Sequence, residues 1–293
     1  MPFAVFRCCP TSMFLKYYES STDAVLKTLG IEFIDLKDFN CCGYPLKNFS
    51  FNASVLCSAR NLSLAEARGL DIVTLCSCCY GTLTQAQEIL QKDPELKKRT
   101  NALLNKEGLS LTTSVRVRHL LEVLYDDLGP EKIEARLICR FKDLHVAVQY
   151  GCHFLRPKTK AQTSRTGTPP SLDRLVEITG AKIIHWQKQF DCCGSPMLGI
   201  YNDLSADLKE TKIANARSSG ADIICVSCVY CQLQFNHAHH LIPPKAEEKE
   251  NLPSILFPQL LGLALGIDGK VLGIDQTVSD QQGIMSHLVS NGR

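Results

Sequence analysis

Two short stretches decide the architecture of this chain: CCGYP at residues 41–45 and CCGSP at residues 192–196. A single cysteine precedes each stretch, with 31 intervening residues in the first copy and 39 in the second. A CxxC pair follows each stretch, after 33 and 34 intervening residues. The same order at nearly the same spacing indicates an internal duplication. The two cysteine sets are Cys9, Cys41, Cys42, Cys76 and Cys79, and Cys152, Cys192, Cys193, Cys228 and Cys231.

Each cysteine group follows a segment with the pattern of a β-strand. These segments are residues 3–6, 31–36 and 71–75 in the first copy, and 145–150, 182–186 and 222–226 in the second. Helical stretches alternate with them, which is typical of a parallel sheet. The carboxyl ends of parallel strands share one edge, where open α/β sheets bind their ligands. We therefore expect an α/β fold of two duplicated βαβ domains with approximate internal twofold symmetry and one site in each.

The segments outside the two copies predict helices. Residues 115–128 are amphipathic and end at Gly129-Pro130, and residues 255–267 form an apolar run. We therefore divide the chain into four parts. They are a first cysteine-rich domain at 1–92, a helical connection at 93–143, a second cysteine-rich domain at 144–242, and a C-terminal helical tail at 243–293 that packs on the domains.

Composition excludes several classes of function. The 293 residues carry 32 Lys+Arg against 30 Asp+Glu, a net charge of +2, which argues against nucleic-acid binding. No run approaches the roughly 18 apolar residues of a transmembrane helix, and the N-terminus is too polar at Arg7 for a secretory signal. We expect a cytoplasmic protein. In a reducing compartment, 15 cysteines indicate metal or redox chemistry rather than disulfide bonds.

Each set offers five thiolates. Four thiolates satisfy a structural Zn²⁺ or an ordinary iron–sulfur cluster, so five are one more than either needs. Adjacent cysteines also fit poorly to a tetrahedral site, because neighbouring side chains diverge. The pattern predicts a multi-iron cluster with only thiolate ligands in each copy.

Five further cysteines lie outside this repeated pattern. Cys8, Cys78 and Cys225 lie beside predicted ligands, and the sequence leaves their roles open. We expect Cys57 and Cys139 to be small buried apolar residues. The first copy departs more from the repeated pattern, because Cys8 and Cys78 lie beside its predicted ligands. Zn²⁺ or a different cluster in the first copy therefore stays an alternative.

The repeated pattern resembles the CCG cysteine-rich domain, which occurs twice in one subunit family of heterodisulfide reductase. The stretches GCHFLRP at residues 151–157 and FPQLLGLALG at residues 257–266 are similar to that family too, so the resemblance covers essentially the whole chain. It implies a noncubane [4Fe–4S] cluster on the five cysteines of each copy. It also implies a disulfide substrate between the clusters, reduced one electron at a time. A sulfur-oxidising branch of the family runs thiol or persulfide chemistry the other way, on lipoate-bound sulfur.

Two residues near the second set are candidates for catalysis. His153 follows a predicted ligand, and we expect it to donate a proton or to contact the substrate. We expect Arg156 to pair with a substrate carboxylate.

The chain has no flavin or nicotinamide motif, so we expect electrons to pass through partners, an iron–sulfur subunit and a flavoprotein. The substrate would be a disulfide or a lipoate-carrier protein, and any membrane association would be peripheral and through the partners. The alternative is an electron-transfer subunit of another oxidoreductase complex, with zinc in the first copy. Such chains carry ferredoxin-like runs of C-x₂-C-x₂-C-x₃-C-P, and their absence here favours the first interpretation. The sequence leaves open the substrate, the direction of electron flow and the stoichiometry of the complex.

Overall fold

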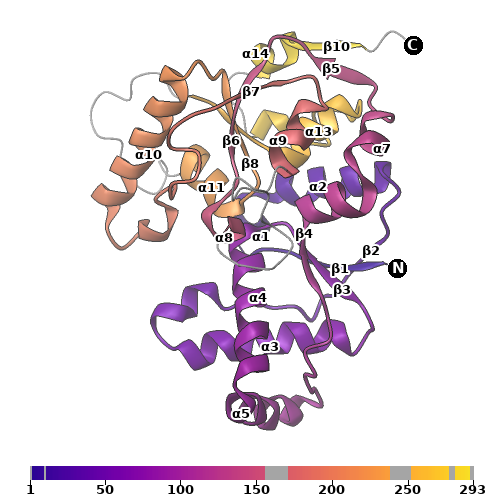
Figure 1. The fold of residues 1–293 in the computed structure, drawn as a ribbon, viewed down its shortest axis with the longest axis vertical. Helices are drawn as coiled ribbons and strands as arrows, with labels where there is room; N and C mark the ends of the chain where they lie inside the picture. Colours follow the sequence, from indigo (N-terminus) through magenta and orange to yellow (C-terminus); the bar gives the residue numbers. More distant parts are fainter. Residues whose placement is uncertain (1, 10, 156–170, 238–251, 277–280, 291–293) are drawn as a thin grey trace.

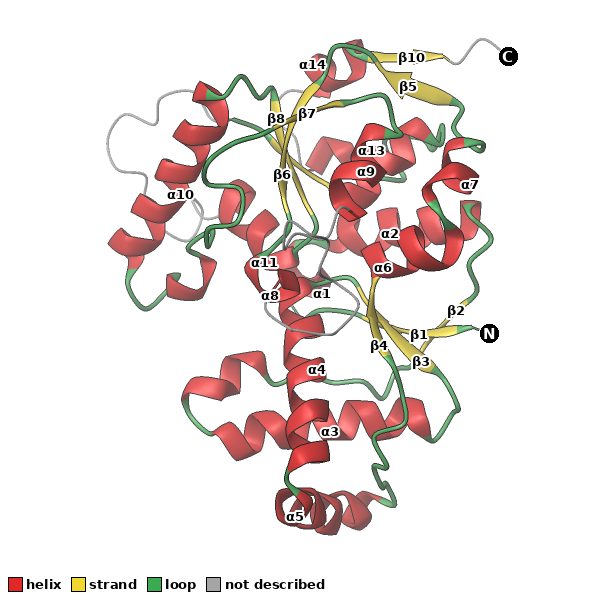
Figure 2. Ribbon diagram, in the orientation of Figure 1, coloured by secondary structure: helices red, strands yellow, loops and turns green. Residues whose placement is uncertain are grey.

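Two parallel four-stranded sheets with helices around them form the framework of the molecule (Figure 1). The computed structural model describes residues 2–9, 11–155, 171–237, 252–276 and 281–290. Figure 2 shows one sheet in each half of the molecule, with the helices of each half packed around it. The α/β fold and its repeated parallel sheets are therefore confirmed.

The first half contains β1 (Phe3–Phe6), α1 (Thr11–Phe14), α2 (Lys16–Thr28), β2 (Phe33–Asp35), η1 (Tyr44–Asn48), α3 (Phe51–Glu66), β3 (Asp71–Thr74), α4 (Ser77–Lys92), α5 (Pro94–Leu104), η2 (Asn105–Glu107), β4 (Val117–His119), α6 (Leu120–Glu122), the π-helix η3 (Val123–Leu128) and α7 (Pro130–Glu134).

The second half contains β5 (Cys139–Phe141), β6 (His145–Gln149), α8 (Cys152–Leu155), α9 (Ser171–Glu177), β7 (Lys182–Ile184), η4 (Ser195–Met197), α10 (Asn202–Ser218), β8 (Ile223–Val226), α11 (Val229–Gln232), the π-helix η5 (Leu233–His237), β9 (Ser254–Leu256), α13 (Phe257–Ala264), η6 (Ile274–Gln276), α14 (Gln281–Ser286) and β10 (Leu288–Ser290).

The two sheets have the same topology. The strand order is β2-β1-β3-β4 in one sheet and β7-β6-β8-β9 in the other, and every neighbouring pair is parallel. The three predicted strands of each copy occupy the first three places. A short antiparallel pair, β5 with β10, lies apart from both sheets.

The fourth strand of each sheet corrects two predictions. Residues 115–128 do not form one helix, because Val117–His119 pair with β3 as β4. The His119 side chain then accepts a hydrogen bond from the Leu121 backbone N–H, and so caps α6. Residues 254–256 likewise pair with β8 as β9, and α13 begins only at Phe257. The segments predicted as a helical connection and a helical tail therefore each supply an edge strand.

Packing across the molecule joins the two halves. Helix α2 of the first half packs against α13 near the C-terminus, and α4 packs against α8 (Figure 1). The Ser77 hydroxyl donates to the Tyr150 backbone carbonyl at 3.1 Å, and the Ser227 hydroxyl donates to the same oxygen at 2.8 Å. One buried carbonyl oxygen thus receives a hydrogen bond from each half. Among the described helices, none is long and apolar enough to cross a membrane.

Candidate metal centre

Strand ends place all ten predicted ligands. In each half, one cysteine group follows each of the first three strands of the sheet. The CxxC pairs begin at equivalent helix N-caps. Cys76 precedes α4 with φ and ψ of −127° and 124°, and Cys228 precedes α11 with −134° and 130°. The duplication therefore extends to the backbone conformation of the site.

The glycine after each Cys-Cys pair permits a turn that other residues would strain. Gly43 has φ +93° and Gly194 has φ +89°, in the left-handed region that favours glycine. A Cβ at Gly43 would lie 2.5 Å from the Ser54 carbonyl oxygen, and one at Gly194 would lie 2.6 Å from that of Ser205. Each turn thus packs its backbone directly on the following helix, α3 or α10.

The five predicted ligands of the first set form a continuous run of thiol contacts. Cys9 and Cys42 each hydrogen-bond to Cys41, Cys42 contacts Cys79, and Cys79 contacts Cys76. Hydrogen bonds from Cys42 and Cys9 hold the pKa of the Cys41 thiol well below its ordinary value. Cys9 is the exposed end of the run, whereas Cys42, Cys76 and Cys79 are buried.

The second set has the same connectivity. Cys152 and Cys193 each hydrogen-bond to Cys192, Cys193 contacts Cys231, and Cys231 contacts Cys228. The hydrogen bond to Cys192 raises the pKa of the Cys193 thiol to about 12. Each set therefore brings together the five thiols that the sequence predicts.

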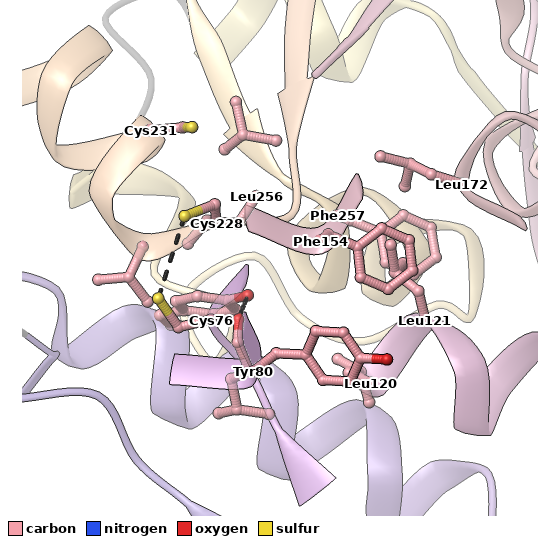
Figure 3. Close-up of a cluster of buried hydrophobic side chains, with 14 of the residues drawn as sticks. Cys76, Tyr80, Leu120, Leu121, Phe154, Leu172, Cys228, Cys231, Leu256 and Phe257 are labelled. Carbon is pink, nitrogen blue, oxygen red and sulfur yellow. Dashed lines mark hydrogen bonds between the residues drawn. The ribbon is translucent and has the colours of Figure 1, made fainter. Parts of the chain in front are cut away.

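The two sets meet at the junction between the halves. The Cys76 and Cys228 sulfurs lie 4.0 Å apart, as the dashed line in Figure 3 shows. Both side chains are buried. All ten sulfurs thus form one run that crosses from one sheet edge to the other.

His153 lies at the same junction. Its Nδ1 atom is 3.5 Å from the sulfur of Cys78 in the first half and 3.5 Å from that of Cys152 in the second. Its ring lies edge-on to Tyr44, with the ring centroids 5.1 Å apart. His153 is therefore placed to contact whatever lies between the sets. Arg156, the other predicted catalytic residue, lies outside the described residues.

Comparison with known families places this chain among cysteine-rich proteins. The cysteine-rich CCG domain matches twice, at residues 3–84 and 146–236. The chain belongs to this family. It is also 36% identical to a subunit of the ferredoxin/F(420)H(2)-dependent CoB-CoM heterodisulfide reductase of Methanosarcina acetivorans, over 93% of this chain and 92% of that one. Within the CCG family, it therefore belongs with these heterodisulfide reductase subunits.

Two further similarities bear on function and fold. The chain is 32% identical to the 8-methylmenaquinol:fumarate reductase membrane anchor subunit of Wolinella succinogenes, over 95% of this chain and 97% of that one. A crystal structure of a hypothetical protein from Helicobacter pylori superimposes with a TM-score of 0.75 and 21% identity. The superposition covers 94% of this chain and 51% of the Helicobacter pylori chain. This last similarity shows the fold alone.

The relatives and the site together indicate the class of this CCG protein. The matched relatives are parts of reductases, which supports an oxidoreductase role within a multi-subunit complex. The donor set is chemically uniform, because sulfur is the only ligand atom that the ten predicted positions offer. Soft thiolate donors suit iron–sulfur clusters and zinc. The residues present therefore fit an iron–sulfur or other thiolate-bound metal centre.

The structure also places cysteines whose role the sequence left open in this CCG protein. Cys8 lies within the first set, with its sulfur within 4.8 Å of those of Cys76 and Cys79. Cys78 lies at the junction, within the same distance of Cys76 and Cys228. Cys225 is buried inside β8, and burial raises the pKa of its thiol. In the sequence, all three cysteines lie near predicted ligands. Only the fold shows that Cys8 and Cys78 lie among the ligand sulfurs, whereas Cys225 is part of a strand.

Proposed function

We propose that this chain is the catalytic iron–sulfur subunit of a heterodisulfide-reductase-like complex. It would act on a disulfide, thiol or persulfide, including lipoate-bound sulfur, at two noncubane [4Fe–4S] clusters. The observation that carries the proposal is the run of ten sulfurs across the junction, with Cys76 and Cys228 in contact at 4.0 Å. The resemblance to the two-CCG-domain family of heterodisulfide reductase supplies the cluster type.

The proposed chemistry explains why two sets would meet. Converting a disulfide to two thiols takes two electrons and two protons. When bound, two clusters would supply one electron each, and iron is a suitable partner for each released thiolate sulfur. The five cysteines of each set would hold one cluster. Burial of Cys76 and Cys228 keeps water away from the point where the sets meet.

His153 and Arg156 complete the proposed site. His153 would contact the substrate or donate a proton, a role supported by its equal 3.5 Å distances to a sulfur of each half. Tyr44 lies beside His153, and the Tyr230 ring lies 5.8 Å from that of Tyr44 on the other side of the junction; the two tyrosines would supply apolar contact area. Arg156 would pair with a substrate carboxylate.

Partners would deliver or remove the electrons. The names of the relatives support partner subunits, and we propose that these are an iron–sulfur electron-transfer subunit and a flavoprotein. The substrate would be a small disulfide or a lipoate-carrier protein. A cytoplasmic location, with any membrane contact made through partners, stays a prediction.

A second candidate is an electron-transfer subunit of another oxidoreductase, with zinc in the first set. The Wolinella relative favours it, because that protein is named a subunit of a fumarate reductase and matches nearly the whole chain. Cys8, Cys76 and Cys79 also favour it, because their three sulfurs lie close enough together to ligate a single ion.

Metal and acid-labile sulfide analysis of anaerobically purified protein tests these proposals, together with EPR after thiol oxidation. About eight irons per chain are expected for two clusters of four irons. A new EPR signal on adding a thiol under oxidising conditions would support chemistry on sulfur. About four irons with one zinc would support the second candidate, and zinc alone would contradict both.

A further inference from the structure

Lys212 is a buried cation beside the second cysteine set. Its side chain, on α10, is 1% exposed. The ammonium donates to the backbone carbonyl oxygens of Lys188 and Asp191, the latter at 3.0 Å, and lies 4.6 Å from the centroid of the Trp186 ring. Asp191 directly precedes Cys192. The buried charge is therefore built into the loop that carries the second Cys-Cys pair.

The charges around Lys212 come from the cysteine set and one carboxylate. Burial lowers the pKa of Lys212 to about 8, whereas Cys231, Cys193 and Asp191 act in the opposite direction. The Asp191 carboxylate is half exposed and already pairs with the Lys188 ammonium at 3.1 Å. An ion buried in protein needs compensating charge. Cys231 and Cys193 are thus the buried groups that would compensate this charge once bound metal deprotonates them.

The first set has a neutral amide at the equivalent place. A constant offset of 151 residues relates Cys41 to Cys192 and Gly43 to Gly194, and it relates Asn61 to Lys212. Asn61 is also fully buried. Its Nδ2 donates to the Cys41 carbonyl oxygen at 3.1 Å, and its Oδ1 accepts from the Asn40 backbone N–H at 2.9 Å. Both residues hold the same loop, but only one of them carries charge.

Cys8 is a second difference between the two halves. It lies within the first set, whereas the equivalent residue of the second half is Gly151. A Cβ at Gly151 would lie 2.8 Å from the Ser77 hydroxyl, so no side chain fits there. Among the described residues, the first set therefore has the thiol of Cys8 beside it and no buried Lys or Arg, whereas the second has Lys212 and a glycine at the place of Cys8.

We propose that Lys212 acts as a positioning charge that makes the second cysteine set the more readily reduced of the two centres. The inference rests on the proposed function, in which each set binds an iron–sulfur cluster. Net charge and hydrogen bonds around a cluster set its reduction potential. A fixed positive charge stabilises the form that carries an added electron. An electron from an external one-electron donor thus settles on the second centre first.

Redox titration of the anaerobically purified full chain with dithionite, followed by EPR, tests this proposal. The signal that survives in Cys231→Ala identifies the first centre, and it should be the one with the lower midpoint potential in the wild type. Lys212→Gln should lower the midpoint potential of the second centre and leave the first unchanged. Lys212→Arg, which keeps the charge, should have the wild-type midpoint potential at the second centre.

Lys188→Gln is the matched control. It removes an ammonium from the same loop, but this ammonium is partly exposed and water already screens its charge. It should shift neither potential. Full iron content with an unchanged potential in Lys212→Gln would overturn the role of Lys212. If Lys212→Gln loses iron, its potential cannot be compared with that of the wild type. The proposal is then tested on the wild type alone, and a higher midpoint potential at the first centre than at the second would overturn it. A wild-type chain that holds no iron would instead refute the proposed function.

Discussion

Two adjacent cysteines can serve one site here only because of the glycine that follows them. Neighbouring side chains normally diverge, but Gly43 turns the chain with φ +93° and lets the backbone lie against α3. The Gly43 N–H also donates to the Cys41 sulfur at 3.4 Å, which favours the thiolate. The turn, as much as the thiols, therefore forms the site.

Replacing Gly43 tests this role. Gly43→Ala adds a methyl group 2.5 Å from the Ser54 carbonyl oxygen, on top of the roughly 1–2 kcal/mol cost of a left-handed conformation. We expect a loss of stability of about 3 kcal/mol and reduced iron in the first set. Gly69→Ala is the matched control, because Gly69 has φ +63° but no atom within 4 Å of the added Cβ. Equal effects of the two substitutions in thermal unfolding would contradict the close packing.

Removing single thiols tests the ligand assignment. Cys231→Ala should lose the iron of the second set, about half of the total for two clusters, together with the activity on sulfur. Cys139→Ala should retain all of the iron, because Cys139 lies on β5, which belongs to neither of the sheets whose strand ends carry the cysteine groups. Iron content and EPR would check both variants. Normal iron in Cys231→Ala would refute the assignment.

At the level of elements, the sequence reveals strands that lead to cysteines but not the strands that close the sheets. The first three strands of each half alternate with helices and end at a motif, so pattern and chemistry agree. β4 and β9 instead run directly into α6 and α13, and the apolar residues of strand and helix merge into one run. Only tertiary contacts distinguish the strand from the helix in each run: β4 pairs with β3, and β9 pairs with β8. The division at residues 92, 143 and 242 stays a prediction.

The loop that leads into β4 depends on one carboxylate. Glu66, the last residue of α3, accepts hydrogen bonds from the backbone N–H groups of Thr112 and Ser114 at 2.6 and 2.8 Å. Burial alone would raise the pKa of Glu66, but hydrogen bonds from Ser114 and Thr112 lower it to about 2. Because the folded-state pKa lies below the ordinary value of 4.5, the stabilisation is complete above pH 4.5 and is lost as the pH falls towards 2.

We therefore expect Glu66→Gln to lower the free energy of unfolding by about 1 kcal/mol at pH 7, after allowance for solvent screening. The difference from wild type should shrink below pH 4.5. Thermal unfolding of both proteins side by side between pH 7 and pH 3 would check this, since any effect of acid on metal content is then common to both. Glu107→Gln is the control, because its carboxylate pairs with Arg60 at an exposed site. A difference that stays constant with pH would contradict the role of Glu66.

For the whole molecule, the duplication predicts two sites but not how they meet. The spacing of the motifs is readable within each half, whereas the contact of Cys76 with Cys228 joins residues that are 152 positions apart in the sequence. Lys212 and Asn61 occupy equivalent positions in the two copies, but only the fold shows that both are buried against the loop of the Cys-Cys pair. Residues with no recognisable motif therefore decide whether ten cysteines make two independent centres or one.

Gly81 is one such residue, and it gives the sharpest test of the junction. It lies on α4, where a Cβ would come within 2.9 Å of the His153 backbone oxygen and 3.2 Å of the His153 Cβ. In a helix, Gly→Ala ordinarily stabilises by up to about 1 kcal/mol. Here we expect Gly81→Ala to destabilise by about 1–3 kcal/mol, because backbone of the other half must move away.

The larger variant Gly81→Leu should separate the two sets. Each set keeps its own ligands, so we expect iron content close to that of wild type but loss of turnover with a disulfide, because Cys76 and Cys228 no longer meet. Gln85→Ala, at an exposed position one turn further along α4, should change stability by less than about 0.5 kcal/mol. If Gly81→Ala proves as stable as wild type, the halves do not approach each other here. If Gly81→Leu turns over normally, chemistry across the junction is excluded and each centre acts alone.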